Sequence, residues 1–108
     1  GGENAIFVTG DKYSLYGGNT VSGATRDNNF KILCAIINGA SSEIRTNGVG
    51  TTGNAGTDPM TGITVGNAQG GGLWTQGDIG DVLVYNALLS GAQVGQAETI
   101  INTDWVIF

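Results

Sequence analysis

The chain has 108 residues, of which 40% are hydrophobic and 12% are charged, with a formal net charge of −5 and no histidine. This length is typical of one domain, and the acidic balance excludes a nucleic-acid partner, because phosphates require clustered lysine and arginine. Without histidine, the Ser/His/Asp and Cys/His catalytic sets are excluded, as are zinc sites that need imidazole.

The N-terminal quarter of the chain predicts short antiparallel strands separated by glycine turns. We expect a first strand over residues 5–9, and then a hairpin formed by residues 13–16 and 20–24 across Gly17-Gly18-Asn19. Alternation of polar and apolar residues places three side chains on the inward face: Tyr13, Leu15 and Val21.

Residues 30–37 are almost continuously apolar, which predicts a strand that is buried on both faces at the centre of a sheet. Cys34 lies within this run and is the only cysteine, so it is expected to act as a small buried hydrophobic residue. Asn38-Gly39 and Asn47-Gly48 predict tight hairpin turns, because both residue types tolerate positive φ.

The middle of the chain carries weaker signals. Residues 49–55 predict a strand rich in threonine and glycine, residues 54–60 a loop, and residues 63–65 another short strand. Residues 66–77, GNAQGGGLWTQG, predict a flexible glycine loop that carries Trp74.

The C-terminal quarter predicts a strand followed by a capped helix. Residues 79–85 are rich in β-branched and aromatic residues, as strands are. Ser90 is typical of a helix N-cap, and Gln93 completes a capping box. Helical spacing then gives one apolar stripe of Val94, Ala97, Ile101 and Trp105, with Ile100 beside it. We expect residues 106–108 to add a strand or to pack beneath the helix.

The segment from Gly77 to Trp105 reads Gly-Asp-Ile-x-Asp-Val-Leu-Val-Tyr-Asn, then Leu-Leu-Ser, then a short helix that ends in tryptophan. This pattern resembles the closing strand and helix of the laminin-G-like, concanavalin A-like lectin/glucanase superfamily. The Asn38-Gly39 turn after its strand and the Gly62–Gly66 strand before a glycine loop also resemble that family, in the family's order. Together these matches cover roughly residues 30–105.

The resemblance implies an antiparallel concanavalin A-like β-sandwich, or jelly roll, with one short C-terminal α-helix. The spacing of strands and turns, without repeated βαβ units, independently indicates an all-β sandwich or jelly roll. Full sandwiches of the family are longer, so residues 1–108 are expected to be one domain that is shortened or is the C-terminal part of a larger protein. Missing outer strands would leave sheet edges to be covered by a neighbouring subunit or domain.

Little in the sequence predicts catalysis. Glycosidases of the resembled superfamily carry paired carboxylates in patterns such as Glu-x-Asp-x-x-Glu, and that pattern is missing. Asp78 and Asp81 form the only close acidic pair, and their spacing in a strand places them on opposite faces. We expect Asp78 to cap a turn and Asp81 to make a structural hydrogen bond. No enzymatic activity and no catalytic residue is therefore predicted.

Sugar binding is the better chemical hypothesis, because it needs an aromatic face and a few amide or carboxylate groups. Trp74 in its glycine loop meets the first need, and the predicted polar contacts are Asn67, Gln69, Gln76 and Asp58. The alternative is that Trp74 anchors its loop onto the core. Trp105 is expected to pack in the core. Calcium supports ligand binding in some members of the resembled group, but the chain has no run of spaced acids, so no metal and no cofactor is predicted.

The sequence therefore predicts a non-enzymatic carbohydrate-binding module of a surface or virion protein, whose partner is a glycan or cell-surface polysaccharide. Its predicted location is extracellular, on the cell surface or on a virion. The alternative is a structural or assembly module, such as part of a phage tail fibre, virion decoration or adhesin, with contacts to a further copy or a neighbouring domain. Neither nucleic acid nor membrane insertion is predicted, because no apolar run approaches the roughly 20 residues of a membrane span.

Overall fold

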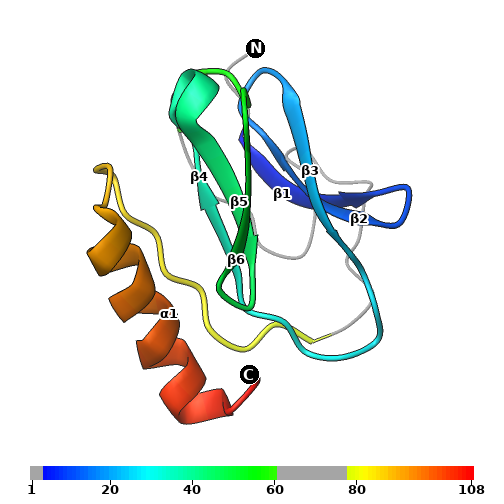
Figure 1. Ribbon diagram of the computed structural model, residues 1–108, viewed down its shortest axis with the longest axis vertical. Coiled ribbons are helices and arrows are strands. Elements are labelled where there is room, and N and C mark those ends of the chain that lie inside the picture. The colour runs from blue at the N-terminus through cyan, green and yellow to red at the C-terminus, as the bar shows by residue number, and fades with distance from the viewer. Residues whose placement is uncertain (1–3, 61–77) are drawn as a thin grey trace.

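Residues 4–60 and 78–108 are described by a computed structural model, in which two three-stranded antiparallel sheets are followed by one helix (Figure 1). The first sheet contains β1 (Ala5–Thr9), β2 (Lys12–Tyr16) and β3 (Thr20–Thr25), in that order. The second contains β4 (Leu33–Ile36), β5 (Ser42–Thr46) and β6 (Val49–Gly53). A 3₁₀ turn, η1 (Gly39–Ser41), joins β4 to β5, and the helix is α1 (Gly91–Trp105).

The first sheet confirms the hairpin that the glycine turns predicted. β2 pairs with both neighbours, and its partner β3 begins directly after Gly17-Gly18-Asn19. The three side chains predicted to face inward are all buried: Tyr13, Leu15 and Val21. Leu15 lies on the central strand β2 and is fully buried, so the first sheet contributes this side chain to the core.

The second sheet is organised around β5, whose side chains alternate between two environments. Ser42, Ile44 and Thr46 are buried, whereas Glu43 and Arg45 lie on the other face. The turn that follows confirms the Asn-Gly prediction, because residue 47 has φ of 49° and residue 48 has φ of 81°. Positive φ at both central positions is the requirement of a two-residue type I′ hairpin.

The prediction for residues 30–37 was wrong in two respects. Only Leu33–Ile36 form a strand, and within the described residues this strand pairs with β5 alone, so β4 is an edge strand whose side chains are only half-buried. Asn38-Gly39 is also not a two-residue hairpin. Ser42 instead accepts a hydrogen bond from the Asn38 N–H and donates one to the Gly39 carbonyl, which favours the 3₁₀ turn.

The two sheets share one hydrophobic core. Leu15 and Val21 from the first sheet meet Ile44 from the second, with Ala55, Ala35 and Ile37 around them. Close approach of the sheets requires a glycine at position 23, because a Cβ there would lie 2.9 Å from Cγ2 of Ile44. These contacts show that the two sheets pack against each other.

Residues 79–85 do not form the strand that their composition predicted. No strand is present between residues 78 and 90, and the segment leads into α1 as an irregular connection, the yellow trace of Figure 1. β-propensity expresses packing against cross-strand neighbours, and a ladder also supplies backbone hydrogen bonds. Within the part of the chain that the structure describes, no neighbouring strand supplies either.

α1 begins as the sequence predicted. The Ser90 hydroxyl accepts a hydrogen bond from the Gln93 N–H at 3.2 Å, and the Gln93 side chain accepts one from the Ser90 N–H at 2.9 Å. The predicted apolar stripe is only partly buried. Val94 is buried, but the other fully buried helix residue is Glu98, and Trp105 at the end of the stripe keeps 46% of its surface exposed.

Glu98 is buried because it pairs with Arg45 on the outer face of β5. The guanidinium donates to both carboxylate oxygens, at 3.0 Å from Nε and 2.9 Å from an Nη. It also donates to the Gly48 carbonyl at 2.8 Å, and it lies 3.4 Å from the Glu43 carboxylate. The hydrogen bonds to Glu98 raise the pKa of Arg45. This bidentate pair holds α1 against the second sheet.

Replacing Glu98 with glutamine is expected to lower the free energy of unfolding by about 2–3 kcal/mol, because a half-buried guanidinium loses its compensating charge. Glu43→Gln is the matched control. It removes a longer and more exposed contact, so its expected cost is below about 1 kcal/mol. Urea denaturation of the two variants measures both values. Equal costs would contradict the assignment of helix docking to Glu98.

Cys34 also lies near this ion pair, because it is opposite Arg45 in the β4–β5 register. The sequence predicted a buried residue, and the structure shows a half-buried one on an edge strand. Burial raises the pKa of the Cys34 thiol above its ordinary value of 9.0, and the negative charge of Glu98 acts in the same direction. The folded protein therefore favours the neutral thiol.

This shift predicts a loss of stability in alkali. The thiol of the unfolded chain ionises first as pH rises, so the folded state holds more protons and stability falls from about pH 9 until the folded thiol also ionises. Below about pH 8 the thiol holds its proton in both the folded and the unfolded state, so it does not make the free energy of unfolding depend on pH. Cys34→Ala should remove this component, so the difference in unfolding free energy between wild type and variant should shrink between pH 8 and 10. A pH-independent difference would show that the thiol does not titrate differently in the two states.

Candidate ligand-binding site

Four of the five residues predicted to bind a glycan, Trp74, Asn67, Gln69 and Gln76, lie outside the described residues and stay predictions. The fifth, Asp58, lies in the loop after β6. Its N–H donates to the Gly17 carbonyl at 2.9 Å, and its carboxylate lies beside Gly18. Gly17 and Asn19 both donate to the Ala55 carbonyl in the same place. Asp58 therefore belongs to the junction at which the 54–58 loop ties the two sheets together.

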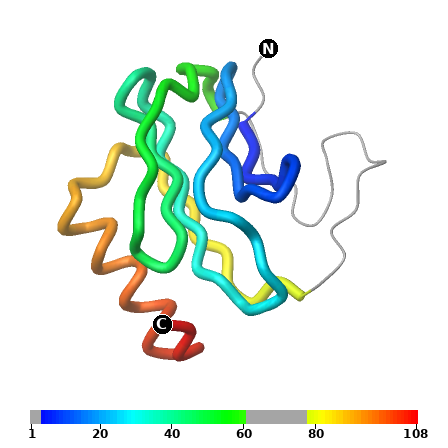
Figure 2. The backbone as a smooth tube through the Cα atoms, turned by 45° about the vertical axis from the view of Figure 1, so that its right-hand side comes forward, coloured from blue at the N-terminus to red at the C-terminus, as the bar shows by residue number. Residues whose placement is uncertain are grey.

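A hollow of about 390 Å³ is lined in part by the residues that end α1 and follow it, near the C-terminus. Figure 2 shows the C-terminus at the opposite end of the molecule from the N-terminus. The hollow is built from three separate parts of the chain: the segment before β4, the β5–β6 turn and the end of α1. Its lining residues are Asn29, Phe30, Lys31, Asn47, Trp105, Val106 and Ile107. Aromatic, amide and aliphatic groups thus meet in one place, although they are up to 78 positions apart in sequence.

Trp105 forms the aromatic side of the hollow, and its ring is held by three contacts. The ring stacks on Phe30 with centroids 6.3 Å apart and planes inclined by 27°. Its Nε1–H donates to Asp81 at 2.8 Å, which confirms the predicted structural hydrogen bond of that aspartate. Gly80 lies so close that a Cβ there would be 2.7 Å from the ring. The ring orientation is therefore defined before any ligand arrives.

The prediction that Trp105 packs in the core was wrong. Its exposed fraction is 46%, and its aromatic neighbour Phe30 is itself 55% exposed. The physical reason is position: Trp105 is the last residue of α1, beyond the turn that contains Glu98 and faces the sheet. Helical periodicity shows which residues share one face of a helix. It does not show how far the sheet beneath that face extends.

The polar groups of the hollow come from two amides and one ion pair. Asn47 accepts a hydrogen bond from the Ile32 N–H through Oδ1 at 3.0 Å, which orients the side chain and leaves its NH₂ group as a donor. Lys31 lies 2.7 Å from Asp27, and this contact lowers the pKa of that carboxyl. The positive charge beside the hollow is therefore already balanced.

Backbone strain also occurs at this hollow. Val106 ends α1 with φ of 51° and ψ of 57°, a left-handed conformation that is unusual for a β-branched residue. The strained turn is held by Asn102, whose Oδ1 accepts from the N–H groups of Ile107 at 2.7 Å and Phe108 at 2.9 Å. Phe108 in turn lies against Gly48. The tail thus folds back toward the β5–β6 turn and forms no strand, contrary to one of the two expectations.

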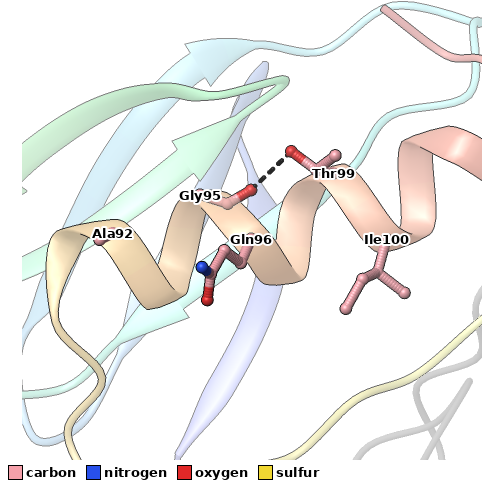
Figure 3. A pocket seen from close by; sticks show the side chains of 5 residues that line it. All are labelled: Ala92, Gly95, Gln96, Thr99 and Ile100. Atoms are coloured by element: carbon pink, nitrogen blue, oxygen red, sulfur yellow. Dashed lines mark hydrogen bonds between the residues drawn. The ribbon is translucent and has the colours of Figure 1, made fainter.

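A second, larger hollow of about 600 Å³ follows the outer surface of α1 (Figure 3). All its lining residues come from that one helix: Ala92, Gly95, Gln96, Thr99 and Ile100. Gln96 and Ile100 project from the same side, whereas the Thr99 hydroxyl donates to the Gly95 carbonyl at 2.8 Å. Small side chains create this depression. None of its lining residues comes from a second element, so the depression is part of the surface of α1.

The first hollow combines an aromatic face with two amide side chains. An exposed indole face can cover the C–H surface of a ligand, while amides can bond hydroxyl groups. Among the described residues, no group of three or more histidine, cysteine, aspartate or glutamate side chains is placed to hold a metal ion. Helices of the described part include none that is both long and apolar enough to cross a membrane.

Sequence reasoning missed most of this hollow. Asn29, Phe30 and Lys31 were not singled out as site residues, and Asn47 was noted only for its turn. Trp105 and the Asn-Gly turn were visible signals, but no local pattern indicates that they meet. Their proximity depends on the docking of α1 on the second sheet.

Comparisons with known proteins provide no relative. No family model, no curated protein and no solved structure matches the chain. The resemblance to the concanavalin A-like superfamily therefore remains a prediction from the sequence.

Val106→Gly is expected to raise the free energy of unfolding by about 0.5–1 kcal/mol, because glycine adopts the left-handed C-cap conformation without a Cβ penalty. Val106→Ala is the matched control, since it removes the same exposed methyl groups but keeps a Cβ. Thermal unfolding should show a higher Tm for the glycine variant by about 3–6 °C. Glycine and alanine variants of equal stability would contradict the left-handed conformation.

Proposed function

We propose that the chain is a carbohydrate-recognition domain of a cell-surface or virion protein, with the hollow beside Trp105 as a sugar subsite. The observation that carries the proposal is the half-exposed indole ring held by Phe30, Gly80 and Asp81 beside two amide side chains. Sugar rings present a C–H face that packs on an indole and a rim of hydroxyl groups that bond to amides.

The size and rigidity of the hollow support this proposal. Its volume of about 390 Å³ lies near the lower end of the usual range for ligand pockets, about 300–1,000 Å³, and suits one or two sugar rings. Because Trp105 and Asn47 are already oriented, binding would order few side chains, and the entropy cost would be small. Recognition would therefore proceed with little conformational change.

The proposed fold is a shortened concanavalin A-like sandwich, consistent with two antiparallel sheets that share a core and carry one outer helix. In this proposal the predicted contacts around Trp74 form a second part of the binding surface. Asp58 is not part of the proposed subsite, because it participates in the junction between the sheets.

An assembly module is the second candidate function. The observation that favours it is the segment 79–85, whose large apolar side chains are half-exposed. A surface of this kind is typical of protein contacts. The two functions are compatible, because a module that assembles presents several copies of a weak sugar site and gains avidity.

A glycan array with purified protein tests the recognition function. Wild type is expected to bind a subset of neutral glycans, and Trp105→Ala should weaken that binding at least 10-fold, which corresponds to about 1.4 kcal/mol. Asn29→Ala should weaken it roughly 5-fold through loss of one hydrogen bond. Ile100→Ala, an exposed residue of the same helix, is the matched control and should bind as wild type does.

Circular dichroism and urea denaturation must show that the variants are folded. Retained binding in Trp105→Ala, together with lost binding in Trp74→Ala, would move the site to the glycine loop. An array without signal above background for wild type would reject the recognition function altogether.

A further inference from the structure

Among the described residues, exposed large apolar side chains are concentrated in the segment before α1. Six large side chains there have exposed fractions of 47–63%: Ile79, Val82, Leu83, Val84, Tyr85 and Leu88. The sequence of this segment is that of a strand, yet in the described structure it belongs to neither sheet. Within the described residues, its backbone also makes no hydrogen bond to another backbone segment. Among residues 4–60 and 78–108, the peptide donors and acceptors of this apolar strand sequence therefore have no partner in another backbone segment.

Two contacts hold one end of this segment in place. Gly80 packs under the Trp105 ring, and the Asp81 carboxylate accepts the indole hydrogen bond. The segment is thus anchored to α1, which fixes its position at one end. An anchored strand sequence that pairs with no described strand is suited to strand addition.

We propose that residues 79–85 pair antiparallel with the same residues of a second copy, across a two-fold axis at Val82, to form a homodimer. A two-fold contact must be complementary to itself. In this register Ile79 lies opposite Tyr85, and Val82 lies opposite its own counterpart. Asp81 lies opposite Leu83, so no carboxylate faces another carboxylate. The remaining large apolar side chain of this range, Val84, lies opposite Gly80.

The exposed area is large enough for such a dimer. The five large apolar residues of the paired range leave roughly 500 Å² exposed on each copy, so a contact that covers them on both would bury about 1,000 Å², near the smallest area expected of a specific interface. Among the described strands, β1 also lies at a sheet edge, but it is a weaker candidate, since only Ile6 and Val8 are large exposed apolar residues there. Pairing of the segment with β1 of another copy would be heterologous and would produce rings or open chains, unless two copies exchanged the contact reciprocally.

Charge substitution at Val82 tests the proposal, because in this register the residue faces itself at about 5 Å. Wild type is expected to be a dimer in analytical ultracentrifugation at micromolar concentration. Val82→Lys and Val82→Glu should each be monomeric under the same conditions, with dissociation constants raised at least 100-fold by like charges at the axis. An equimolar mixture of the two variants should restore a dimer that contains one copy of each.

The control is Ile100→Lys, which places the same charge on an exposed apolar residue of α1 and should leave the dimer intact. Val82 is half-exposed, so its variants are expected to fold, and circular dichroism verifies this. A monomeric wild type at several hundred micromolar, dimers in each single variant, or a mixture that stays monomeric would each overturn the proposal. Species larger than a dimer would indicate heterologous pairing and would overturn the two-fold register.

Discussion

The ion pair between Arg45 and Glu98 determines where the C-terminal third of the described fold lies. Arg45 is on the outer face of the central strand β5, and its guanidinium holds both oxygens of a helix carboxylate that is only 5% exposed. With α1 docked in this way, Trp105 follows seven residues later, about 10 Å along the helix axis. That distance takes the indole beyond the sheet-facing turn and brings it to the β5–β6 turn, where the hollow forms.

Trp105 connects the two surfaces for which functions are proposed. One side of its environment is the hollow with Asn47, and the other is the anchored segment with Gly80 and Asp81. A dimer across Val82 would therefore place two copies of the sugar subsite close to a common two-fold axis. Weak binding of single sugars at such paired sites is strengthened on a surface that displays many copies of the glycan.

The candidate site could be predicted from the sequence only in its chemistry. An exposed tryptophan beside amides was expected, but at Trp74 instead of Trp105, because the helical stripe assigned Trp105 to the core. The stripe was correct for Val94, which is buried, and incomplete at Glu98, whose burial depends on a partner 53 positions away. The sequence alone predicts that burial of a charged residue on an apolar helix face is unfavourable, because it does not show which residue of opposite charge will pair with it.

The sequence alone determined the elements that depend on neighbouring residues: the Asn47-Gly48 hairpin and the Ser90 capping box. Their physical causes, positive φ and a local hydrogen bond, act within a few residues. Only the tertiary structure decided that, among the described strands, β4 pairs with β5 alone and residues 79–85 pair with none. An apolar run shows that a segment favours burial, but the number of strands beside it depends on contacts between distant parts of the chain.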